Sequence, residues 1–187
     1  MLEIRFHGRG GQGTVVASIL LAKAFFGAGN YVQTFPVFGL ERRGAPVEAY
    51  LRLDKKKILV RSNVYTPDHV VVQDIKLLDN LDVTHGLKLG GSILINCKDV
   101  PENLDTFSGF HLHFVDAAKI GLNNGLGTQT NPIVNTAMIG AFARIMDMPP
   151  MDTIYAAIKE EIPIKTNNNF QAAQQAYEEV HSFGLVD

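Results

Sequence analysis

The sequence predicts an α/β fold: a Rossmann-like, mostly parallel twisted sheet with helices on both faces and C-terminal helices. Two observations lead to this prediction. Short apolar or alternating segments typical of strands are interleaved with helical segments. A glycine-rich turn, residues 8–13, joins the first expected strand to the first expected helix. No repeat or linker divides the chain, so we expect a single domain over residues 1–187.

Composition narrows the functional class. Apolar residues make up 46% and charged residues 19%, as in soluble globular proteins, and the formal net charge is -2. That charge predicts no binding of nucleic acid or of an anionic membrane. The chain begins without a basic segment followed by an apolar one, and its most apolar run, residues 15–28, contains Lys23. This run is shorter than the roughly 20 residues that span a bilayer, so we expect a cytoplasmic protein.

The first elements are predicted by their apolar patterns. Residues 2–6 alternate apolar and charged side chains, as a strand does. Residues 14–26 are almost continuously apolar, which predicts a helix buried on more than one side. The glycines of residues 27–30 end this helix, and residues 31–35 form a second strand that stops at Pro36.

The middle of the chain predicts a hairpin and then a buried strand. Residues 47–53 alternate cleanly, and the lysine turn at residues 55–57 leads into a partner strand at residues 58–61. The β-branched run at residues 69–73 is typical of a strand buried on both faces. Asp74 is placed to cap a short helix after it.

The remaining elements are two strands followed by helices. Residues 92–96 form a strand, and residues 111–115 form the last one, with a short helical turn after it. From Asn131 the chain is expected to be helical to its end. Asn131-Pro132 is the predicted start of a helix that reaches about Met146, and two amphipathic helices follow at residues 151–161 and 169–182.

The glycine turn is the first candidate site. Gly8, Gly10 and Gly13 have the G-x-G-x-x-G spacing, and they lie between a strand and a helix. Glycines permit a tight turn and a close approach of phosphate to the backbone, while the helix N-terminus offers unpaired N–H groups. The alternative is that the glycines only allow the helix to pack closely on the sheet.

A dinucleotide would require a carboxylate about 20 residues after the turn, to bind the ribose hydroxyls. No carboxylate lies in residues 33–36. Arg42 and Arg43 are suited instead to the 2′-phosphate of NADP, although no hydride-transfer set accompanies them. A stand-alone NADP-binding oxidoreductase therefore remains an alternative.

The loop over residues 39–46 is the second candidate site. Arg42 and Arg43 follow a short strand and are expected beside the glycine turn, where arginine side chains would bind phosphate or carboxylate. Glu41 is expected to pair with one of them and leave the other available. The candidate binding residues are Gly8, Arg9, Gly10, Gly11, Gln12, Gly13, Thr14, Arg42 and Arg43.

Other residues carry weaker signals. The single cysteine, Cys97, ends an apolar strand and is interpreted as a buried structural thiol. His111 and His113 share a strand face but have no evident third metal ligand, and His7 is placed to orient the glycine turn. The small or polar residues of the helix after Asn131 fit either close helix packing or ligand contact. They are Asn135, Thr136 and Gly140.

Several ordered stretches together resemble the gamma subunit of the 2-oxoacid:ferredoxin oxidoreductases, and specifically the pyruvate:ferredoxin oxidoreductase (pyruvate synthase) type. The resemblance to the pyruvate and branched-chain ketoacid types rests on the arginine loop and on residues 67–74, and pyruvate is favoured. The matching stretches are residues 8–13, 38–47, 61–62, 67–74 and 135–141.

The resemblance implies a complex that converts a 2-oxoacid to acyl-CoA and CO2 and passes the electrons to ferredoxin. Thiamine diphosphate, Mg2+ and iron–sulfur clusters are expected on other subunits, with coenzyme A bound on or with them. The implied partners are alpha, beta and delta-type subunits, with ferredoxin as electron acceptor; a homodimer is an option for the isolated chain. The gamma chain is expected to have no catalytic residue and no metal site. It would support the catalytic subunits and line the coenzyme A site, or act as a scaffold alone.

Overall fold

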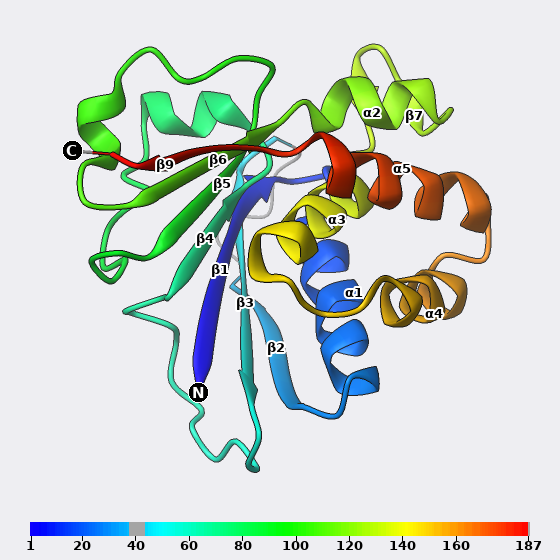
Figure 1. Cartoon of the computed structure of the whole chain (residues 1–187), viewed down its shortest axis with the longest axis horizontal. Helices are drawn as coiled ribbons and strands as arrows, with labels where there is room; N and C mark the ends of the chain where they lie inside the picture. The colour runs from blue at the N-terminus through cyan, green and yellow to red at the C-terminus, as the bar shows by residue number, and fades with distance from the viewer. Residues whose placement is uncertain (38–43, 187) are drawn as a thin grey trace.

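A computed structural model describes residues 1–37 and 44–186 (Figure 1). The elements in chain order are β1 (Leu2–Arg9), α1 (Thr14–Gly27), β2 (Tyr31–Val37), β3 (Pro46–Asp54), β4 (His69–Val72), the 3-10 helix η1 (Ile75–Asp79), β5 (Ser92–Asn96), the 3-10 helix η2 (Leu104–Phe107), β6 (His111–Val115), α2 (Ala117–Asn123), β7 (Gly127–Thr128), β8 (Asn131–Pro132), α3 (Asn135–Met146), α4 (Met151–Glu161), α5 (Thr166–Glu179) and β9 (His181–Leu185).

A seven-stranded sheet in the order β2-β3-β1-β4-β5-β6-β9 forms the centre of the fold. Strands β1, β4, β5 and β6 are parallel to one another, while β3 on one side and β9 on the other are antiparallel to their neighbours. The predicted α/β class with a largely parallel sheet is therefore confirmed, with antiparallel strands added at both edges.

The two faces of the sheet bury two apolar cores. Because side chains alternate along a strand, Ile4 and Phe6 of β1 lie in the larger core with α1, α3 and α5. Figure 1 shows these helices and α4 gathered on one side of the sheet. The smaller core lies on the other side, where Val70 and Val72 of β4 pack against residues near η1, η2 and the connecting loops.

Helix α1 has the buried character that its sequence predicts. It contacts β1, β2 and β3 of the sheet as well as α3 and α4, so little of its surface remains in water. Beyond its end, Gly29 adopts a φ of 81°, and the Asn30 side chain donates to the Phe25 carbonyl at 3.1 Å. These residues stop the helix and turn the chain into β2 at the edge of the sheet.

The predicted hairpin between residues 47–53 and 58–61 is wrong. The first strand is present as β3, but residues 58–61 form no strand. The reason lies in hydrogen bonding, because β3 pairs along one edge with β1 and along the other with β2. No edge of β3 remains for a third partner.

The prediction for the C-terminal part is wrong in two places. Asn131-Pro132 forms β8, which pairs with β7, and the helix begins instead at Asn135. The chain is also not helical to its end, because His181–Leu185 forms β9 against β6. Strand β6 would otherwise be the edge of the sheet with unpaired backbone groups, and β9 satisfies them. Within the described ranges, no helix has the length and apolar character needed to span a membrane.

Candidate functional site

The glycine turn lies at the carboxyl end of β1 and is tied to the start of β3. Gly10 N donates to the Ala45 carbonyl at 2.9 Å, and Gly44 N donates to the Gly10 carbonyl at 3.2 Å. Gly13 is the N-cap of α1, with a left-handed φ of 75°. The turn therefore connects the strand, the helix and the end of the loop that carries the two predicted arginines.

Two of the glycines are required by close packing. A Cβ at Gly8 would collide with the Thr14 hydroxyl, and one at Gly13 would lie 2.8 Å from Asn135 Nδ2. Asn135 is buried at the start of α3, so Gly13 lets α1 and α3 approach each other. Gly11 differs, because it is exposed and a Cβ there meets no atom of the described residues within 4 Å. Close packing among the described residues thus explains Gly8 and Gly13 but does not explain Gly11.

Arg9 and Gln12 are both held by one carboxylate. Asp74 Oδ2 lies 3.0 Å from Arg9 Nε and accepts from Gln12 Nε2 at 2.9 Å. Gln12 Oε1 in turn accepts from Arg9 N at 2.8 Å. Asp74 also accepts from Lys76 N at 3.0 Å and so caps η1, as the sequence predicts. These bonds fix the path of the turn relative to β4.

A cleft of about 270 Å³ lies beside the contacts of Asp74 with Arg9 and Gln12, at the carboxyl ends of β4, β5 and β6. Ligands of open α/β sheets bind at such carboxyl ends, near the point where the strand order reverses. Among the predicted binding residues that the structure describes, Gln12 alone lines the cleft. The polar side chains lining it are those of Gln12, Gln73, Asp74, Asn96, Lys98 and Asp116.

Gln73 is the most buried polar residue of the cleft. Its Oε1 accepts from the Thr14 hydroxyl at 2.8 Å, while its Nε2 finds no hydrogen-bond partner within residues 1–37 and 44–186. Asn96 donates to the Gln73 carbonyl at 2.9 Å and holds the ends of β4 and β5 together. Sequence reasoning did not select Gln73, Asn96 or Asp116 as site residues. The available signal was that each directly ends or follows a predicted strand.

Arg42 and Arg43 lie outside the described residues, as does Glu41. The described chain ends at Val37 in β2 and resumes at Gly44, which is bonded to Gly10 of the glycine turn. The C-terminal part of the loop over residues 39–46 is therefore held at the glycine turn.

The fold differs from a dinucleotide-binding sheet at this point. In that arrangement, the strand after the first helix lies next to β1 and ends beside the turn. Here β3 occupies that position, is antiparallel to β1, and begins rather than ends beside the turn. The strand that follows α1, β2, lies at the edge of the sheet. This topology gives no support to the NADP alternative.

His7 is buried below the turn. Its Nε2 accepts from Arg5 Nε at 3.0 Å, and its Nδ1 lies 3.5 Å from Glu48 Oε1. Burial, with a smaller contribution from the Arg5 charge, lowers the pKa of His7 to about 3. His7 is therefore a neutral residue that supports β1.

The other residues with weaker signals make contacts that serve the fold. His113 Nδ1 is 2.9 Å from Ser182 Oγ across β6 and β9. Over the described ranges, no group of three or more His, Cys, Asp and Glu side chains is arranged to hold a metal ion. Burial raises the pKa of the Cys97 thiol to about 12. A Cβ at Gly140 would collide with the Ala173 carbonyl, so this glycine serves the packing of α3 on α5.

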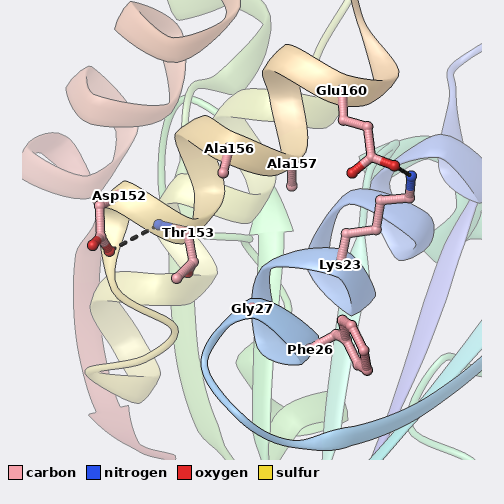
Figure 2. Close-up of a pocket in the computed structure, with 8 residues that line it drawn as sticks. All are labelled: Lys23, Phe26, Gly27, Asp152, Thr153, Ala156, Ala157 and Glu160. Carbon is pink, nitrogen blue, oxygen red and sulfur yellow. Dashed lines mark hydrogen bonds and ion pairs between the residues drawn. The ribbon is translucent and has the colours of Figure 1, made fainter.

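A larger groove lies between α1 and α4 (Figure 2). Its volume is about 530 Å³, and its lining combines apolar Phe26 and Ala157 with the ion pair of Lys23 and Glu160. Lys23 also contacts Glu161. This groove is at the C-terminal end of α1, away from the glycine turn, and presents no set of reactive groups.

Known proteins are similar to this chain over nearly its whole length. Residues 3–179 match the family described as pyruvate ferredoxin/flavodoxin oxidoreductase. The chain is 47% identical to a pyruvate synthase subunit PorC of Methanocaldococcus jannaschii over 96% of this chain and 97% of the relative. It is also 47% identical to a "pyruvate/ketoisovalerate oxidoreductases common subunit gamma" of Thermococcus kodakarensis, covering 95% and 96%.

A solved structure shows the same arrangement. The crystal structure of pyruvate oxidoreductase subunit PORC from Thermotoga maritima superposes with a TM-score of 0.81 at 34% identity, covering 97% of this chain and 98% of that one. The chain therefore belongs to the pyruvate ferredoxin/flavodoxin oxidoreductase family, among its gamma (PorC) subunits.

Proposed function

We propose that this chain is the gamma subunit of a cytoplasmic complex that oxidatively decarboxylates pyruvate to acetyl-CoA and CO2 and reduces ferredoxin. The observation that carries the proposal is the nearly end-to-end similarity to PorC and common gamma subunits. Alpha, beta and delta-type subunits would complete the assembly, and the gamma chain would support those that react with the substrate.

The residues of this chain are consistent with a supporting role. An iron–sulfur cluster takes four thiolates, whereas this chain has one cysteine, and Cys97 is buried with a raised pKa. We propose that thiamine diphosphate with Mg2+ stabilises the substrate carbanion, and iron–sulfur clusters carry electrons, on the other subunits. The role proposed for the gamma chain is therefore to bind coenzyme A and the other subunits and to orient them.

The glycine turn is the proposed point of contact with coenzyme A. No described residue accepts a hydrogen bond from the backbone N–H of Gly11 or Gly13. These groups lie at the N-terminal end of α1, where the helix dipole favours an anion. Asp74 holds Arg9 and Gln12, which keeps the turn in this shape. Arg42 or Arg43, on a loop anchored at Gly10, would add a charge for the phosphates.

Steady-state kinetics of the assembled complex tests the coenzyme A contact. Replacing Arg42, Arg43 or both with Ala should raise the KM for coenzyme A on the order of tenfold, as expected for loss of one charge-assisted contact. The KM for pyruvate should not change. Arg144→Ala removes an exposed arginine from α3 and is the matched control. An unchanged coenzyme A KM in the double variant would leave the chain as a scaffold only.

Purification of the native complex tests the assignment itself. Chains with thiamine diphosphate and with iron–sulfur clusters should co-purify with this one, and pyruvate should be oxidised faster than branched-chain 2-oxoacids. A complex that lacks such chains contradicts the proposal. Faster turnover of branched-chain 2-oxoacids would support the proposed complex but contradict pyruvate as its main substrate.

A further inference from the structure

The segment between β3 and β4 leaves the body of the protein. Residues 55–63, called here the exposed arm, project at the end of the sheet where the N-terminus lies, opposite the glycine turn (Figure 1). Val64 is buried directly after the arm and anchors it. The arm therefore lies at an end of the sheet that the proposed coenzyme A contact does not use.

The arm exposes two apolar side chains that are adjacent in the chain, and two exposed tyrosines lie near its ends in sequence or pairing. Leu59 is 79% exposed and Val60 is 41% exposed, and Tyr65, just beyond the arm, is 70% exposed. Tyr31, which pairs with Asp54 at the base of the arm, is exposed as well. Contiguous exposed apolar residues are typical of interaction surfaces.

The backbone in the middle of the arm is also unpaired. The described chain supplies no backbone hydrogen-bond partner to residues 57–62. Ile58 and Val60 are β-branched and alternate with Leu59 and Lys57, a pattern that favours an extended strand. Because both edges of β3 are occupied, the arm finds no partner strand next to it. An extended segment of this kind can add to the sheet edge of another protein.

The charge of the arm indicates the chemistry of that partner. Lys55, Lys56, Lys57 and Arg61 are all exposed, in a chain whose formal net charge is -2. None of the four forms an ion pair with a described residue. Asp54, the residue directly before the arm, pairs with the N-terminal amine at 2.9 Å. A partner surface would have to supply the carboxylates.

We infer that the exposed arm docks this chain to another subunit of its oxidoreductase complex, by adding a strand to a sheet edge that is flanked by carboxylates. The inference rests on the proposed function, because that function supplies the partner chains. Leu59 and Val60 would bury their side chains in the contact, and the lysines and Arg61 would pair at its rim.

Assembly of the complex with its cognate alpha, beta and delta-type subunits tests this docking. The double variant Leu59→Ser/Val60→Ser should weaken retention of the gamma chain on the order of tenfold. Leu89→Ser and Ile164→Ser are matched controls, because these side chains are 87% and 77% exposed elsewhere on the surface. The isolated double variant should keep the wild-type Tm. Normal retention of the double variant, or equal loss in the controls, overturns the inference.

Cross-linking identifies the partner directly and does not depend on the effect of a substitution on affinity. Cys97 is buried and its thiol pKa is raised to about 12, so a cysteine introduced by Leu59→Cys should be the one that a benzophenone maleimide labels. In the intact complex, this label should cross-link to one other subunit, and a label at Leu89→Cys should not. Cross-linking between two gamma chains, or to no chain, contradicts the inference. A different result would contradict the proposed function: that no subunit with thiamine diphosphate co-purifies with this chain.

Discussion

The side chain of Gln12 donates to Asp74 at 2.9 Å, across 62 positions of sequence. This bond joins the glycine turn after β1 to the first residues after β4. Arg9 reaches the same carboxylate oxygen at 3.0 Å, so a single acid holds both polar side chains of the turn. The turn is thus shaped by a residue that is not part of its motif.

Asp74→Ala should therefore affect both stability and ligand contact. Loss of the Asp74 contacts with Arg9 and Gln12, and of its cap on η1, should lower the free energy of unfolding by about 1–2 kcal/mol. In the assembled complex the KM for coenzyme A should rise, because the turn loses its support. Urea unfolding and steady-state kinetics measure the two effects. Asp79→Ala, at an exposed position of η1, is the control and should change neither quantity.

Two helical glycines should respond to alanine with opposite signs. A Cβ at Gly140 collides with the Ala173 backbone, so Gly140→Ala should destabilise the protein by about 2–3 kcal/mol. A Cβ at Gly27 meets only Thr153 side-chain atoms at 3.6 Å, an ordinary contact, and Gly27→Ala should be neutral or stabilising by up to about 1 kcal/mol. Thermal unfolding of both variants provides the comparison. Equal effects would show that α3 and α5 have room to separate.

The buried arginine of β3 should be among the most sensitive positions. Arg52 is 1% exposed and donates to Glu3 at 2.7 Å, to Gln33 at 3.1 Å and to the Asn63 carbonyl at 3.0 Å. Arg52→Met leaves Glu3 without its buried partner and should lower the free energy of unfolding by about 3–5 kcal/mol. Denaturant titration measures this loss. Lys119→Met, at an exposed position of α2, should change stability by less than about 0.5 kcal/mol.

The pKa of His7 predicts a loss of stability in acid. Its pKa falls from 6.5 to about 3 in the folded protein, because burial disfavours the charged ring. The folded state therefore binds fewer protons than the unfolded state. The stabilising contribution is complete above pH 6.5 and is lost as the pH falls toward 3.

The free energy of unfolding, measured at a series of pH values, checks this linkage. His7→Gln keeps an acceptor for Arg5 but does not titrate, so its stability should fall less steeply between pH 6.5 and pH 4 than that of the wild type. His181→Gln alters an exposed histidine and should retain the wild-type slope. Parallel curves for the wild type and His7→Gln would show that other groups account for the acid sensitivity.

Much of the fold was predictable where local pattern and tertiary environment agree. Residues 14–26 have so little polar surface that a helix packed on several sides was the expected result, and α1 is such a helix. The strands around residues 69–72 and 92–96 were predictable for the same reason, since β-branched apolar runs suit the centre of a parallel sheet.

The errors arose where pairing decides the structure. Residues 58–61 have a strand-like pattern, yet β3 has no free edge for them. Residues 181–185 have a weak pattern, yet β6 offers an unpaired edge and they become β9. Of the candidate site, the turn was predictable from its glycines. The cleft beside it was not, because Gln73, Asn96 and Asp116 lie at the carboxyl ends of three strands that only the sheet places together.

By itself, the sequence determined that this protein has an α/β fold, a glycine turn between β1 and a buried helix, and membership of an oxidoreductase family. These properties depend on residues close together in the chain or on ordered motifs along it. Only the tertiary structure decided that Asp74 holds Arg9 and Gln12, that β3 separates β1 from β2, and that residues 55–63 remain exposed. Each of these depends on contacts between distant segments, which local patterns do not encode.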